Sequence, residues 1–93
     1  MDSNEVEVLA EFFSHISDPT RLKLLFHLLG GESCVCDMVD ELDVSTSAVS
    51  HQLRRLRVGN LIKRRKAGRH VYYSLADEHV RILLSVGLEH IRE

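Results

Sequence analysis

The chain has 93 residues and a mass of 10.6 kDa, with 44% hydrophobic and 28% charged residues and a net charge of −2. This size fits one domain with one small core over residues 1–93, and the composition excludes a disordered, fibrous or disulfide-stapled chain. Apolar runs stay far below the roughly 20 residues that cross a bilayer and the N-terminus is acidic, so we expect a cytoplasmic protein without a signal peptide or a membrane partner.

The first half of the chain is predicted to be helical. Apolar residues at helical spacing predict an amphipathic helix over about residues 4–16. The pair Asp18-Pro19 is an N-cap followed by a proline at the first helical position, and Gly30-Gly31 ends the second helix. A short third helix is expected over residues 33–42, with its apolar side facing the core.

A helix-turn-helix is predicted next, over about residues 34–58. Ser45 is well placed to cap a fourth helix from Thr46 to about Val58, and only a short turn separates this helix from the third. Two short strands around an Ala67-Gly68 turn then form a hairpin over about residues 61–75. This order of elements is typical of a winged helix, an α+β fold that is mainly helical and carries a two-stranded β-hairpin as its wing.

The cationic residues are concentrated on these two elements. Eight of the twelve Lys and Arg residues fall within residues 54–69, and no Asp or Glu lies between Asp43 and Asp77. Phosphates respond to the local field, so this segment favours a polyanionic partner, although charge alone also allows a solvated cationic face.

Double-stranded DNA is therefore the expected partner, read by helix side chains and held at its phosphates by cations. The expected contacts are Thr46, Ser47, Ser50, His51, Arg54 and Arg55 in the fourth helix, and Lys63, Arg64, Arg65, Lys66 and Arg69 in and beside the wing.

Several motifs together resemble one family. With Asp18-Pro19-Thr20-Arg21, Cys34-Val35-Cys36-Asp37, Ser47–Leu53 and Tyr72–Leu75 in view, the chain resembles the ArsR/SmtB family of bacterial metal-sensing repressors over nearly its whole length. The resemblance implies an obligate homodimer that releases operator DNA when metal binds. An enzyme with a small-molecule substrate is not expected, because neither a nucleophile with a paired histidine nor a Gly-rich phosphate loop is visible.

The last helix, over about residues 77–92, is predicted to have two apolar stripes. Ile82 and Val86 form one stripe, and the other contains Val80, Leu84, Gly87 and Ile91. A helix that is apolar on two faces has two neighbours, and the second is most simply the same helix of another protomer. We therefore expect a two-fold homodimer that uses the helices over residues 4–16 and 77–92.

Four side chains near the ends of this helix are candidate Zn²⁺ ligands. His79 and His90 lie within about 20° of each other around the axis but roughly 16 Å apart along it, so they cannot bind one ion within one helix. In an antiparallel pair of helices, Asp77 and His79 of one chain would meet His90 and Glu93 of the other, and this ligand set suits Zn²⁺. The same spacing resembles the last-helix site of the family's zinc sensors. The alternative is that Asp77 only caps the helix and the histidines lie at the surface.

Cys34 and Cys36 are a possible second metal or redox site. They resemble the family's thiolate site for arsenic(III), cadmium or lead, but the arsenic-type pattern has a further cysteine where Val39 stands. The cadmium type uses cysteines of the N-terminal arm, and residues 1–33 contain none. Two structural thiols are the favoured interpretation. A thiol-based sensor of these metals or of oxidants, and a winged-helix protein-interaction module, stay as alternative functions.

Overall fold

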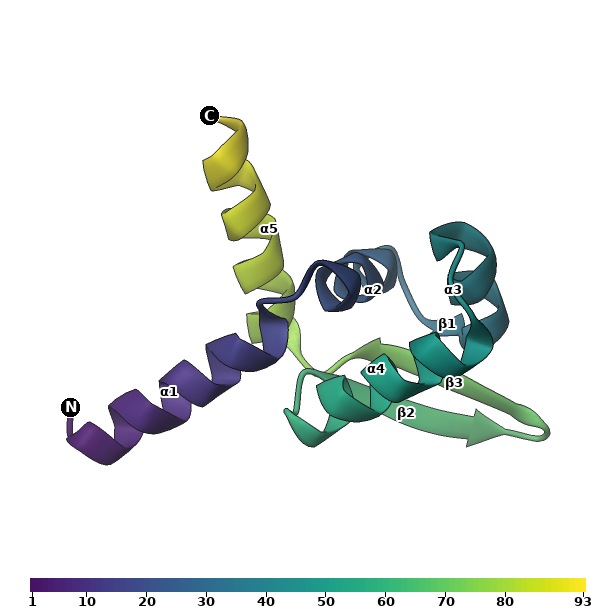
Figure 1. The fold of residues 1–93 in the computed structure, drawn as a ribbon, viewed down its shortest axis with the longest axis horizontal. Helices are drawn as coiled ribbons and strands as arrows, with labels where there is room; N and C mark the ends of the chain where they lie inside the picture. Colours follow the sequence, from purple (N-terminus) through teal and green to yellow (C-terminus); the bar gives the residue numbers. More distant parts are fainter.

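The computed structural model describes all 93 residues as five helices and three strands (Figure 1). Their order is α1 (Ser3–Ile16), α2 (Pro19–Leu29), β1 (Ser33–Cys34), α3 (Val35–Leu42), α4 (Thr46–Val58), β2 (Ile62–Ala67), β3 (His70–Leu75) and α5 (Glu78–Arg92). The predicted α+β winged helix is confirmed. None of these helices has the length and hydropathy needed to cross a membrane.

The helices begin where side chains can accept hydrogen bonds from free backbone N–H groups. Asp18 accepts from Arg21 N at 3.0 Å and Ser45 accepts from Ala48 N at 3.1 Å, so both predicted N-caps are confirmed. Each cap satisfies one of the donors that a helix start leaves unpaired. These caps fix the starts of α2 and of α4.

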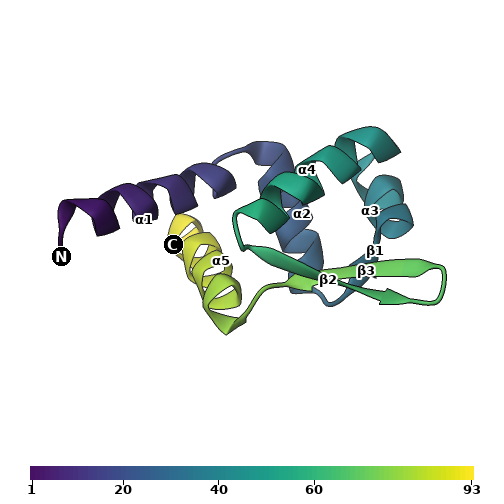
Figure 2. The same ribbon diagram turned by 90° about the horizontal axis from the view of Figure 1, so that it is seen from below.

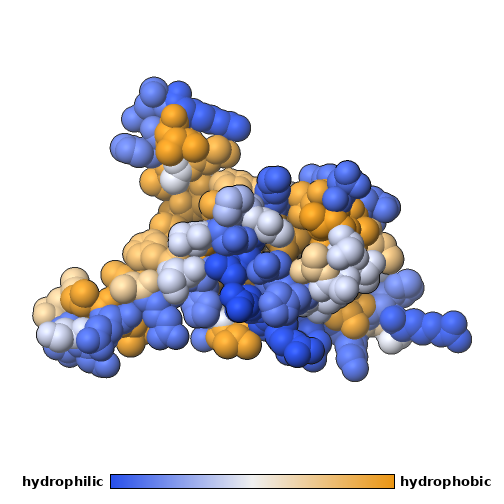
Figure 3. Space-filling model, in the orientation of Figure 1, coloured by the Kyte–Doolittle hydropathy of each residue, from blue (hydrophilic) through white to orange (hydrophobic).

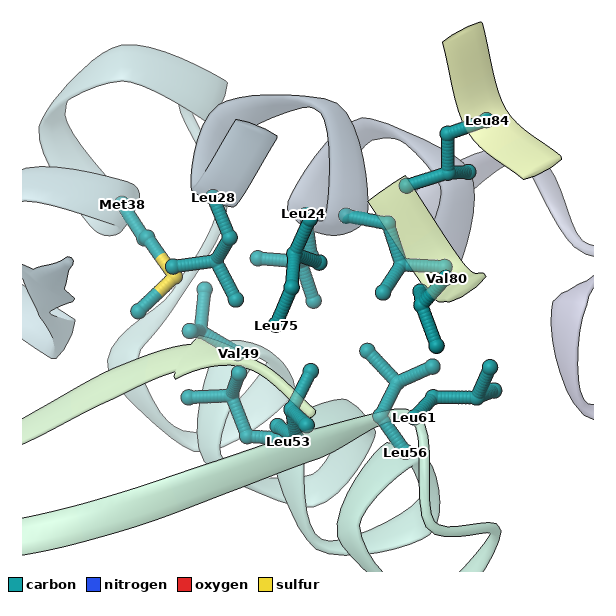
Figure 4. Close-up of a cluster of buried hydrophobic side chains, with 12 residues drawn as sticks. Leu24, Leu28, Met38, Val49, Leu53, Leu56, Leu61, Leu75, Val80 and Leu84 are labelled. Atoms are coloured by element: carbon teal, nitrogen blue, oxygen red, sulfur yellow. The ribbon is translucent and has the colours of Figure 1, made fainter. Parts of the chain in front are cut away.

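Twelve buried apolar side chains form the core, ten of which are labelled in Figure 4. They come from α2, α3, α4, α5, the two long strands and Leu61, which precedes β2. No residue of α1 is buried. Figures 1 and 2 both show α1 projecting away from the body of the domain, and Figure 1 shows the C-terminal part of α5 doing the same.

The sheet differs from the prediction in two details. It has three strands in the order β1-β3-β2, because Ser33 pairs with Tyr73 and Cys34 with Tyr72. The expected helix over residues 33–42 therefore begins only at Val35, since Cys34 is extended and pairs with Tyr72 on the side of β3 opposite β2. The hairpin turn consists of Gly68 and Arg69, because Ala67 pairs with His70, and Gly68 has the positive φ of 63° that favours glycine.

Candidate nucleic-acid interface and metal centre

The outer face of α4 is free to meet a ligand. Val49, Leu53 and Leu56 are buried on its inner face. The six predicted contact residues, Thr46, Ser47, Ser50, His51, Arg54 and Arg55, are all exposed. A three-residue turn, in which Asp43 adopts a left-handed φ of 53°, separates α4 from α3. The structure thus presents α4 as a recognition helix.

Arg21 lies in α2 and is the last residue of the Asp-Pro-Thr-Arg motif. Its side chain links α2 to α4 and to α1. Its guanidinium donates to Gln52 Oε1 of α4 and to the carbonyl of Ser14 in α1, both at 3.4 Å. From the sequence, Arg21 is part of a family motif, and no structural contact of its side chain was predicted. These contacts join the start of α2 to α1 and to α4.

The wing carries five cations, of which only Arg65 has an acidic partner. Its Nε and Nη2 donate to the two carboxylate oxygens of Glu32 at 2.9 and 2.6 Å, and its guanidinium lies 4.9 Å from the centre of the Tyr72 ring. These hydrogen bonds lower the pKa of Glu32 and raise the pKa of Arg65, so the pair is fully ionised at neutral pH. The other four wing cations, Lys63, Arg64, Lys66 and Arg69, are exposed.

We expect Glu32→Gln to strengthen binding to DNA of any base sequence. The Glu32–Arg65 pair is exposed, so a DNA phosphate competes with the carboxylate for Arg65. Removal of the carboxylate should raise affinity for any duplex a few-fold and steepen the salt dependence by somewhat under one unit, the effect of one more phosphate contact. Fluorescence anisotropy from about 50 to 200 mM salt measures both quantities.

The control for this variant is Glu7→Gln, which makes the same charge change in α1. An unchanged salt slope in Glu32→Gln would show that Arg65 does not contact DNA.

His27 is the centre of a polar network on the side of α2. His27 Nδ1 lies 2.6 Å from Glu41 Oε2, and His27 Nε2 lies 2.9 Å from the hydroxyl of Ser33. The network joins α2, β1 and α3. It has the residue types of a hydrolytic triad, but Ser33 is only 6% exposed, so no substrate reaches it. This cluster was not predicted from the sequence.

We expect His27→Ala to lower the free energy of unfolding by about 1–3 kcal/mol, because the buried Ser33 hydroxyl loses its closest partner. Urea denaturation at one fixed protein concentration measures this change. His51→Ala is the control, since the exposed His51 makes no such contacts and its loss should change stability by about 0.5 kcal/mol or less. Equal stabilities of the two variants would contradict a stabilising role for the network.

Two pairs of candidate metal ligands lie at the two ends of α5. At the N-terminal end, Asp77 caps α5 by accepting from Val80 N through Oδ1 at 3.1 Å, and its Oδ2 lies 3.9 Å from His79 Nδ1. Asp77 therefore caps the helix and still presents a second oxygen beside the imidazole. His90 and Glu93 are exposed at the other end. No three such side chains gather within one protomer.

The cysteines of the possible second site are free thiols. Cys34 is half-buried and is the N-cap residue of α3, although its side chain makes no capping hydrogen bond, and Cys36 is exposed. The two cysteines have no third ligand-capable neighbour in the protomer.

Apolar surface lies between the ends of α5 and along α1. Ile82 is 51% and Val86 is 56% exposed. Of the other stripe, Val80 and Leu84 are buried, but Gly87 is exposed and Ile91 is 76% exposed, because this end of α5 extends beyond the core. Figure 3 shows apolar surface along α5 and hydrophilic surface on the wing.

A helix-turn-helix with an exposed polar recognition helix and a cationic hairpin beside it defines a winged-helix DNA-binding transcription regulator, and not an enzyme. Residues 18–64 match the bacterial regulatory protein family arsR. The chain belongs to this family.

Named relatives agree with this assignment. The chain is 50% identical, over all 93 residues, to the transcriptional repressor SmtB homolog of Synechocystis sp., and covers 70% of that protein. It is 45% identical over 86 residues to the cadmium resistance transcriptional regulatory protein CadC homolog of Staphylococcus aureus, with 91% of this chain and 71% of the relative covered.

Two solved structures have the same fold. The solution structure of apo-NmtR, a regulator of Mycobacterium tuberculosis, is 38% identical with a TM-score of 0.85, and the match covers 97% of this chain and 76% of that one. The homodimeric winged helix-turn-helix domain of Mb0332 from Mycobacterium bovis has a TM-score of 0.91 and covers 100% and 89% of the two chains. At 23% identity this second likeness shows the fold alone.

Proposed function

We propose that the protein is a homodimeric, zinc-responsive repressor that acts in the cytoplasm. In this proposal the metal-free dimer binds operator DNA through α4 and the wing, and it releases the DNA when Zn²⁺ binds between the two α5 helices. The names of the relatives support repression, and the CadC homolog's name supports a response to metal.

The observation that carries the proposal is the layout of α5. Ligand-capable side chains lie at both ends of the helix, exposed apolar side chains lie between them, and one protomer brings no three ligands together. A second α5 in antiparallel orientation would cover Ile82 and Val86 and complete the ligand set at each end. Asp77 and His79 of one chain, with the partner's His90 and the partner's Glu93, would hold the ion. When bound, Zn²⁺ would supply a fixed cross-link between the protomers.

Zinc lowers DNA affinity only if it binds the DNA-free arrangement of the dimer more tightly. Linkage then requires DNA to weaken zinc binding by the same factor, which is typically about 5–150-fold. A cross-link between the α5 helices meets this condition if it holds the two recognition helices at a separation that does not match successive major grooves.

Fluorescence anisotropy tests the proposal. The probe is a duplex that the metal-free protein selects from a random-sequence library, so that no operator has to be assumed. We expect tight binding in the presence of EDTA, release on addition of Zn²⁺, and recovery when EDTA is restored. Binding that is unaffected by Zn²⁺ would contradict the proposal.

A thiol-based sensor is the second candidate, since Cys36 is exposed and free and the CadC homolog is named for cadmium resistance. The double variant Cys34→Ser, Cys36→Ser separates the two proposals. Under the first proposal it responds to Zn²⁺ as the wild type does. Under the second it no longer responds to cadmium or arsenite.

A further inference from the structure

Gly59 ends the recognition helix at a point where α1 comes unusually close. It is the C-cap of α4, and its φ of −77° and ψ of 2° are open to any residue, so the backbone does not require glycine here. A Cβ atom at this position would lie 2.9 Å from Cγ, 3.0 Å from Cδ2 and 3.2 Å from Cβ of His15. Carbon atoms pack best at about 3.5–4.0 Å. The close approach of His15 is therefore what requires glycine.

The contact ties the backbone of α1 to α4. The atoms that crowd Gly59 include Cβ of His15, which is bonded to the α1 backbone and cannot swing aside, whereas Cγ and Cδ2 move only if the ring turns to another χ1 rotamer. At Cβ the shortfall from a packing distance of about 3.5 Å is about 0.3 Å, and this relief has to come from a movement of α1 itself.

The same helix has a second, unoccupied side. Phe12 and His15 face the end of α4, where they line a shallow depression with Val58 and Asn60. Val6, Leu9 and Phe13 lie about 120° away around the helix and remain about half exposed. In the proposed homodimer this second side meets the partner, so α1 would lie between the partner protomer and the recognition helix.

We propose that His15 and Gly59 form the joint that fixes the recognition helix relative to the dimer axis, which makes them positioning residues for operator recognition. The inference rests on the proposed homodimer. Two recognition helices must enter major grooves about 34–36 Å apart, and each sits at the end of its own α1. A shift at this joint acts on both protomers and changes that separation, while every DNA-contacting side chain stays in place on its own helix.

Gly59→Ala tests the joint, with sedimentation velocity and two fluorescent duplexes as probes: the selected duplex and a random-sequence duplex of equal length. We expect at least a ten-fold loss of affinity for the selected duplex and less than a two-fold change for the random one. A loss of folded protein would instead lower both affinities equally, so the ratio of the two affinities is the readout.

Gly30→Ala is a matched control. Gly30 is also a helix C-cap, at the end of α2, with a φ of −77° and a ψ of −8°, but the nearest atom to an added Cβ is His27 O at 3.4 Å. The variant makes the same change to the backbone without the clash, and its affinity ratio should equal that of the wild type.

A second substitution tests the contact itself. His15→Ala removes the ring that the new methyl group meets, so His15→Ala, Gly59→Ala should regain most of the ratio that Gly59→Ala loses. His15→Ala alone should lower the ratio by a smaller factor, because it loosens the joint.

The possible failures are distinguishable. The proposed joint is overturned if Gly59→Ala and Gly30→Ala have the same ratio of affinities for the two duplexes. It is also overturned if adding His15→Ala to Gly59→Ala does not restore that ratio. If Gly59→Ala does not fold, His15→Ala alone decides, and a wild-type ratio overturns the proposal. A wild-type protein that sediments as a monomer overturns the proposed homodimer instead.

Discussion

His90→Ala should abolish the response to zinc while leaving metal-free DNA binding close to that of the wild type. His90 is exposed near the end of α5, far from the recognition helix and the wing, so its loss removes a candidate ligand without removing a DNA contact. Anisotropy with the selected duplex should show no release at Zn²⁺ concentrations that release the wild type. The control is His70→Ala in the wing, which should keep the wild-type zinc response.

A mixture of two inactive variants provides a sharper form of this test. His79→Ala alone should also fail to respond. In a heterodimer of His79→Ala with His90→Ala, one end of the α5 pair has both intact imidazoles and the other end has neither. Zinc binding should therefore return, at one ion per heterodimer. A His90→Ala protein that still leaves DNA at the wild-type zinc concentration would exclude the α5 site and favour the cysteines.

Val86→Glu should convert the protein to a monomer and cost at least about 100-fold in affinity for the selected duplex. Val86 is 56% exposed on the face of α5 proposed to meet its copy, where two glutamates would be brought together without counterions. A single recognition helix covers only one half-site, so binding should fall toward the non-specific level, which is typically about 10³–10⁷ weaker than specific binding.

Sedimentation velocity and anisotropy on the same preparation measure the two effects of Val86→Glu. Val86→Ile keeps the side chain apolar and should remain dimeric with wild-type affinity. A Val86→Glu protein that stays dimeric would place the interface elsewhere on the molecule.

The elements that could be predicted are those whose signals are local. Asp18-Pro19 and Ser45 cap α2 and α4 as expected, because capping depends on side chains within three residues of the helix start. Strand β1 could not be predicted, since its two residues are extended only because Tyr72 and Tyr73 lie beside them, almost forty positions further along the chain. The hairpin turn was one residue off because Gly68 marks a turn, but only the strand register decides whether Ala67 or Arg69 shares it.

The site residues also divide into those that local sequence signals predict and those that depend on contacts between distant parts of the chain. The exposed face of α4 follows from helical periodicity alone. The partner of Arg65 does not, because Glu32 is 33 positions away and comes within reach only when β1 joins the sheet. Periodicity predicts that Val80, Leu84 and Ile91 share one side of α5, but it does not predict the point at which the core ends, and only Val80 and Leu84 are buried.

The absence of buried residues in α1 has a consequence for how the protein folds in the cell. A helix of 14 residues is only marginally stable by itself in water, and only the C-terminal part of α1, through Phe12, His15 and Ile16, packs against its own domain. The formation of α1 and the association of two chains would then be one coupled event, so the melting temperature should rise with protein concentration. Newly made or diluted chains would expose a frayed N-terminal segment to proteases, and this would clear unpaired repressor before it could occupy half an operator.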